Sequence, residues 1–141
     1  MKNKAPLTMI EQVIMLLVFA LAAALCLQAF TAANQSSKAY AARDRAATQA
    51  QSTAEALKHT GGDYEEAAQL MGGFLRDGSL TVCYDENWQL SDAPEITYVV
   101  TAPPADTSQP FLAQTTVTVY DDAEQETLFS LPVSWQTGGE R

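Results

Sequence analysis

Residues 7–60 read LTMIEQVIMLLVFALAAALCLQAFTAANQSSKAYAARDRAATQAQSTAEALKHT and contain neither glycine nor proline. The composition favours helix throughout, and the consecutive glycines at 61 and 62 supply a stop signal. A helix of this length would extend for about 80 Å, since each residue adds about 1.5 Å. Uninterrupted helices beyond about 25 residues are typical of membrane spans, coiled coils or repeats. This segment therefore decides the fold.

The first half of the segment is apolar enough to cross a bilayer. Fifteen consecutive apolar residues run from Val13 to Leu27, and Glu11 is the only charge between Leu7 and Ala33. Twenty-seven helical residues extend for roughly 40 Å, more than the hydrocarbon thickness of about 30 Å. The sequence predicts a transmembrane helix half over residues 7–33.

Charge is distributed unevenly along the chain and predicts its orientation. Residues 1–33 carry two lysines and one glutamate, whereas residues 34–141 carry 6 basic and 16 acidic residues, a net of −10. Lysines before a span favour a cytoplasmic N-terminus, so residues 34 onward are expected outside. The acidic balance disfavours nucleic-acid binding, and a hydrophobic fraction of 47% excludes a disordered acidic chain.

Three kinds of processing compete for the N-terminus. A secretory signal peptide could end at the small residues Thr31-Ala32-Ala33, but Glu11 is unusual directly before an apolar core. A lipoprotein signal would need a small residue before the acylated cysteine, and Leu25 precedes Cys26. The third alternative depends on residues 5–11.

The stretch Leu7-Thr8-Met9-Ile10-Glu11, followed by a long apolar helix, resembles the N-terminus of type IV pilins and pseudopilins. In that family a short basic leader ending in Gly precedes Phe-Thr-Leu-Ile-Glu. The resemblance implies a leader over residues 1–6, cleavage before Leu7 by a prepilin peptidase, and a role for Glu11 in setting subunit register. Pro6 stands where the family has Gly, which favours the alternative of an unprocessed single-pass protein.

Glu11 also has an explanation independent of any family. A carboxylate costs about 2.5–3.5 kcal/mol at the bilayer centre on insertion scales. This insertion cost could be offset by a group of another subunit. If Glu11 lies at the cytoplasmic interface, water and Lys4 could offset it instead. The sequence is compatible with both explanations.

The second half of the helix, residues 34–60, carries a stripe of small residues. Members of the stripe recur at spacings of three and four: Ala39, Ala42, Ala46, Ala50, Ala54 and Leu57. A free coiled coil would favour Leu or Ile at these positions. We therefore expect the chain's own C-terminal domain to cover this stripe.

The C-terminal region, residues 61–141, is expected to form a head of one short helix and a four-stranded antiparallel sheet. Asp63 and Glu66 form a capping-box-like start to YEEAAQLM, and Gly72-Gly73 ends it. The predicted strands are 80–84, 96–102, 113–121 and 127–136, each separated by turn residues. Pro132 predicts that the last strand lies at an edge or carries a bulge. The fold class is α+β and pilin-like.

No catalytic or cofactor constellation is evident in the sequence. His59 is expected to complement the dipole at the helix end. The acidic run 121–126 suits a solvated hairpin tip better than a calcium site, and Trp88 and Trp135 suit the core or a sheet face. Cys26 and Cys83 are expected to stay unpaired. We expect a protein that is not an enzyme and has no cofactor or metal.

The resulting functional hypothesis is a pilin-like structural subunit of a type IV filament, type II secretion or DNA-uptake apparatus. Its expected partners are the lipid bilayer, other pilin-like subunits and a prepilin peptidase. The alternative is an unprocessed single-pass membrane protein that presents a scaffold domain outside the cytoplasmic membrane. A third alternative is a secreted domain released after Ala33.

Overall fold

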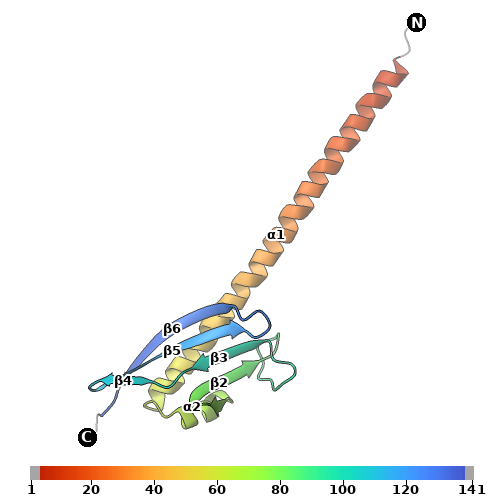
Figure 1. Ribbon diagram of the computed structural model, residues 1–141. Coiled ribbons are helices and arrows are strands. Elements are labelled where there is room, and N and C mark those ends of the chain that lie inside the picture. The colour runs from red at the N-terminus through yellow and green to blue at the C-terminus, as the bar shows by residue number, and fades with distance from the viewer. Residues whose placement is uncertain (1–3, 139–141) are drawn as a thin grey trace. The chain divides into compact units, whose positions relative to one another are not determined.

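The computed structural model describes residues 4–138. Helix α1 runs over Ala5–His59, and the chain divides into two compact units, Met1–Tyr40 and Ala41–Arg141. The first unit holds the apolar part of α1. The second unit, called the head below, holds the remainder of α1, a short helix and a six-stranded sheet (Figure 1).

The ends of both helices follow the predicted stop and start signals. Helix α1 ends at His59, and the amide of Gly62 donates to the Leu57 carbonyl at 2.9 Å. Helix α2, Tyr64–Met71, begins at the N-cap Asp63, whose carboxylate accepts from the amides of Glu65 and Glu66 at 3.0 Å each. Gly72 ends it in a left-handed conformation, which a residue with a side chain adopts only at a cost.

The sheet has six strands rather than the four predicted. The strands are β1 (Phe74–Arg76), β2 (Ser79–Tyr84), β3 (Tyr98–Ala102), β4 (Asp106–Gln109), β5 (Leu112–Asp121) and β6 (Thr127–Gln136). All neighbouring pairs are antiparallel. The four predicted strands correspond to β2, β3, β5 and β6, and the two additional strands are the short β1 and β4.

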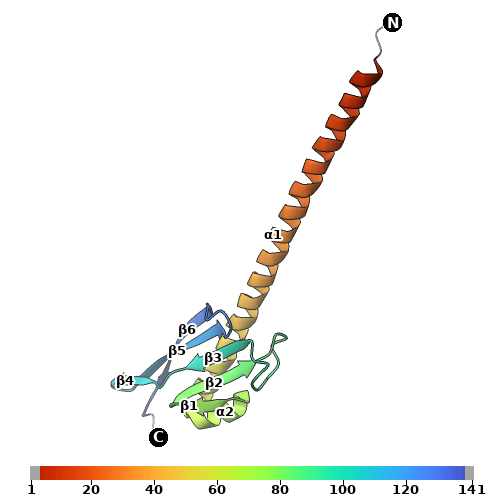
Figure 2. The same ribbon diagram turned by 45° about the vertical axis from the view of Figure 1, so that its right-hand side comes forward.

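The additional strand β4 follows β3 along the same edge of β5. Strand β6 pairs with β5 from Leu112 to Tyr120, so it occupies one edge of β5. Strands β3 and β4 both pair with β5 and therefore share its other edge. Pro103 and Pro104 lie between them, where two residues without amide protons interrupt the ladder. Figure 2 shows β4 beside β5, and β1 beside α2.

Strand β6 has only β5 as a partner in the described part of the chain, so Pro132 lies on an edge strand as predicted. Its register partner is Thr116. An edge position tolerates proline because the missing amide proton is not needed by a second neighbour. The one shift in register between β5 and β6 is at Val119 and Tyr120, away from the proline.

The core of the head lies between the C-terminal part of α1 and one face of the sheet. Side chains of α1 that are buried include Ala46, Ala50, Ala54 and Leu57, and they cluster with Val82 and other residues of the sheet. In Figure 1 the strands lie across the yellow part of α1. The prediction that the chain's own sheet covers the small-residue stripe is confirmed for these four positions.

The stripe extends less far than predicted. Ala42 is only half-buried and Ala39 is exposed. Thr53 joins the buried face instead, and its hydroxyl donates to the Gln49 carbonyl one turn earlier at 2.9 Å. That hydrogen bond satisfies the polar atom within the helix, so a threonine can be buried at this position.

Candidate functional site

The principal candidate site is the exposed apolar surface of α1 in the first unit. Fourteen large hydrophobic side chains between Leu7 and Phe30 are 54–74% exposed. Burying one such side chain is worth about 1.5–3 kcal/mol, so exposure of all of them to water is strongly unfavourable. By length and composition, α1 is the one helix among the described residues able to cross a membrane.

The segment with the leader-cleavage motif begins this helix. Helix α1 starts at Ala5, so Pro6 is in the first turn, where its missing amide proton costs no hydrogen bond. The hydroxyl of Thr8 donates to the Lys4 carbonyl at 3.1 Å. Leu7, Met9 and Ile10 are exposed. The proposed cleavage position therefore lies within helical structure.

Glu11 lies on α1 in the same exposed stretch. It is two turns, or about 10 Å along the axis, from Lys4. The apolar run from Val13 follows it directly. Its carboxylate thus lies within the exposed apolar surface, with Ile10 before it and Val13 after it.

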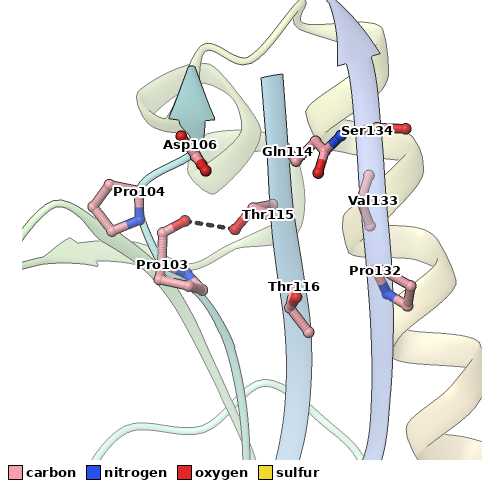
Figure 3. A pocket seen from close by; sticks show the side chains of 9 residues that line it. All are labelled: Pro103, Pro104, Asp106, Gln114, Thr115, Thr116, Pro132, Val133 and Ser134. Atoms are coloured by element: carbon pink, nitrogen blue, oxygen red, sulfur yellow. Dashed lines mark hydrogen bonds between the residues drawn. The ribbon is translucent and has the colours of Figure 1, made fainter. Parts of the chain in front are cut away.

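The head carries a second candidate, a hollow of about 580 Å³ at the break between β3 and β4 (Figure 3). Three prolines, Pro103, Pro104 and Pro132, contribute to its wall, together with Gln114, Thr116 and Ser134. The described residues lining it include one charged side chain, Asp106. Hydrogen bonding from Ser108 lowers the pKa of the Asp106 carboxyl.

One carbonyl fixes the backbone beside this hollow. The Pro103 oxygen accepts from the Thr115 hydroxyl at 2.7 Å and from the Tyr64 hydroxyl at 2.8 Å. Figure 3 draws the first of these bonds as a dashed line between Pro103 and Thr115. The two donors come from β5 and α2, so both elements hold the proline pair in place.

The other side chains considered in the sequence occupy structural positions. His59 is in the last turn of α1, as predicted. Both cysteines are free, with Cys26 exposed and Cys83 buried. Trp135 is in the core, and Trp88 stacks on Tyr98 with ring centroids 4.0 Å apart. Within the acidic run 121–126, Asp121 ends β5 and residues 122–126 connect β5 to β6, as expected for a hairpin tip.

Among residues 4–138, no group of three or more histidine, cysteine, aspartate or glutamate side chains could hold a metal ion. Comparison with known families, curated proteins and solved structures finds no match to this chain. The features of the described chain that bear on function are therefore the exposed apolar helix, the α+β head and the hollow.

The head is expected to lose stability at alkaline pH. Burial raises the pKa of the Cys83 thiol and of the Tyr64, Tyr84, Tyr98 and Tyr120 phenols above their ordinary values of 9.0 and 10.0. A raised pKa means that the unfolded chain releases these protons first. Stability contributed by these groups is thus complete below about pH 9 and falls as the pH rises further.

Thermal unfolding of the full chain in detergent at a series of pH values measures this effect. The Tyr98→Phe variant retains the ring that stacks on Trp88 but removes one ionisable group, so its melting temperature should fall less steeply above pH 10.0. A melting temperature that stays constant into strongly alkaline solution would contradict the prediction.

Proposed function

We propose that this chain is a membrane-anchored structural subunit of a pilin-like assembly, with residues 7–33 in the bilayer or in a bundle of like helices. The head would lie on the outer side of the cytoplasmic membrane. One observation carries the proposal. A helix with fourteen exposed large hydrophobic side chains continues along the chain into the part of α1 that packs under an antiparallel sheet.

The two halves of α1 differ in what can bury their apolar side chains. Small residues on the head half, such as Ala46 and Ala50, are fully buried by the sheet of the same chain. Large residues on the first half, such as Phe19 at 74% exposure, need a cover from outside the chain. Lipid supplies that cover for a single copy, and other copies supply it in an assembly. Both covers are compatible with one subunit at different stages.

Glu11 supplies the test of assembly. In the proposed assembly the Glu11 carboxylate pairs with the N-terminal amine of a neighbouring subunit, as the pilin resemblance implies. We expect Glu11→Ala to lower the assembled fraction at least about a hundredfold, since breaking such a buried ion pair costs about 3–5 kcal/mol. The amount of protein in the membrane should stay the same, because removing a charge does not hinder insertion. Native gel analysis and crosslinking of membrane extracts measure the two quantities separately.

Gln12→Ala is the matched control, because it changes the adjacent residue and leaves the carboxylate. It should assemble normally. If Glu11→Ala assembles as well as Gln12→Ala, the carboxylate has no role in assembly and the proposal loses its main prediction.

A second function is favoured by Pro6, which replaces the glycine expected before a prepilin cleavage site. In this alternative the chain stays unprocessed and presents its head as a scaffold in an envelope complex. The mass of the N-terminal peptide from membrane-extracted protein separates the two. A peptide that begins at Leu7 supports the pilin-like subunit, and one that begins at Met1 supports the scaffold.

A further inference from the structure

The face of the sheet that points away from α1 has a hollow of its own, of about 300 Å³, called the outer-face hollow below. Alternate residues of a strand point to opposite faces of the sheet. Val82 of β2 and Val100 of β3 are in the core cluster with α1, so their strand neighbours face outward. Figure 1 shows β2, β3 and β5 side by side. The outward residues of β2 and β3 that line the outer-face hollow are Ser79, Thr81, Cys83, Val99 and Thr101.

Short side chains in the middle and longer ones at the margins produce this hollow. In the order of the sheet, β2 and β3 lie between β1 and β5. The two middle strands supply the short side chains of the floor. Phe74 and Arg76 of β1 and Tyr120 of β5 are at the margins. Register places Phe74 beside Thr81, and Tyr120 beside Val99, so the margins directly adjoin the floor.

The floor holds polar groups that the protein itself leaves without partners. Thr81 is 7% exposed and Cys83 is 8% exposed, and neither side chain makes a hydrogen bond to another residue of the described chain. Within residues 4–138, every side-chain nitrogen or oxygen that is cut off from solvent does have a partner. The Thr81 hydroxyl therefore reaches solvent, and it does so through the outer-face hollow. A polar group that is open only to a hollow is available to a ligand.

The margins of the outer-face hollow add charges of both signs. Arg76 contributes one positive charge, and Asp77 and Asp122 contribute two negative charges. The negative excess disfavours an anion, and Arg76 disfavours a cation. Burial, followed by the Asp122 and Asp92 carboxylates, raises the pKa of the Cys83 thiol, so the thiol stays neutral. A neutral molecule with several hydroxyl groups suits this site, since a hydroxyl accepts from a guanidinium and donates to a carboxylate.

The size of the outer-face hollow restricts the ligand to a single ring. A volume of about 300 Å³ is at the lower limit of small-molecule sites, which occupy about 300–1,000 Å³. Phe74 and Tyr120 offer aromatic surfaces on the two sides of the floor. A sugar ring combines C–H groups that pack on aromatic rings with hydroxyl groups that the floor and the margins can bind.

The end of the described chain is remote from the outer-face hollow. Gly138 lies beside Phe111, which precedes β5. Tyr120 is nine residues further along the chain, or about 30 Å in an extended strand. The residues that line the outer-face hollow all belong to the head, so one copy carries the whole site.

We infer that the outer-face hollow binds one ring of a neutral sugar, either a free monosaccharide or the end of a longer saccharide. Arg76 donates to hydroxyl oxygens of the ring, and Asp122 accepts from its hydroxyl groups. The Thr81 hydroxyl bonds to the ring from the floor. This binding goes beyond the proposed function and does not depend on it, because a single chain in detergent suffices.

Cys83 reports on occupancy, because its thiol is on the floor. In a Cys26→Ala background, Cys83 is the one cysteine of the chain. The full chain in detergent is treated with N-ethylmaleimide, with and without each of a series of methyl pyranosides. At a sugar concentration ten times the dissociation constant, labelling of Cys83 should slow about elevenfold. If no methyl pyranoside slows the labelling, the inference is wrong.

Thr81→Val is the decisive variant, because it removes the floor hydroxyl and keeps the branched shape that suits a strand. Its head should melt no earlier than that of the parent, since the hydroxyl has no partner in the described chain. The sugar that protects Cys83 should bind about tenfold more weakly, as for the loss of one hydrogen bond.

Thr118→Val is the matched control for this variant. Register places Thr118 beside Thr101 on the same face of the sheet, but Thr118 does not line the outer-face hollow. The control should bind the sugar as the parent does. Equal affinities of Thr81→Val and Thr118→Val for the sugar would overturn the inference.

Beads that carry the protecting sugar through its C1 atom distinguish the two sources of the ring. Retention of the chain on the beads, released by the free methyl pyranoside, supports the end of a longer saccharide. Protection of Cys83 without retention supports a free monosaccharide. Protection by a zwitterionic amino acid such as glycine, and by none of the sugars, contradicts the assignment of a neutral sugar.

Discussion

Replacing Leu57 by alanine is expected to lower the free energy of unfolding of the head by about 2–5 kcal/mol, the usual cost of truncating a fully buried leucine. Leu57 is 0% exposed and is among the largest fully buried side chains in the described chain. It projects from α1 into the cluster that includes Val82 and Trp135. Most other buried α1 side chains there are alanines, which cannot extend to fill the space left behind.

Denaturant unfolding of the full chain in detergent, followed by the fluorescence of the buried Trp135, measures this loss. Leu70→Ala is the matched control, since Leu70 is on α2 and is 59% exposed. It should change stability by less than about 0.5 kcal/mol. Equal losses for the two variants would mean that α1 does not contribute to the core as described.

The helices could be predicted because their signals are local. A segment without glycine or proline ends at Gly61-Gly62, and the structure ends α1 at His59. Asp63 with Glu66 predicts the start of the next helix, and the Asp63 carboxylate caps α2. Hydrogen bonds within a few residues determine both features, so neighbouring residues suffice to predict them.

Strands β1 and β4 could not be predicted, because their signals come from partners elsewhere in the chain. β4 reads Asp-Thr-Ser-Gln, is exposed along its whole length and is surrounded by prolines, so its sequence is typical of a loop. It is a strand because β5 is ten residues long and extends past the end of β3. β1 has only three residues, too few for an alternating pattern.

The candidate site was likewise predictable only in part. The apolar surface near Glu11 is contiguous in sequence, so composition alone identifies it. The hollow joins prolines from two distant segments, 103–104 and 132, which only the fold brings together.

A double substitution at the centre of the apolar segment, Val18→Lys with Leu21→Lys, is expected to reduce membrane integration strongly. The fourteen large hydrophobic residues contribute roughly −4 to −8 kcal/mol to insertion at about 0.3–0.6 kcal/mol each. Two central lysines cost about 5–7 kcal/mol together. Both positions lie near the middle of residues 7–33, so neither lysine can easily extend its amine to water at an interface.

The matched control places the same two charges with the same spacing at the outer end of the segment, as Thr31→Lys with Asn34→Lys. Lysines near the interface extend their amines into water, so integration should persist. Resistance to alkaline carbonate extraction measures the difference. If both variants remain in the membrane to the same extent, residues 7–33 do not cross it. If only the variant with the central pair is released, the cost of a lysine depends on its depth, as expected for a transmembrane helix. Any assembly must then begin from subunits held in the bilayer.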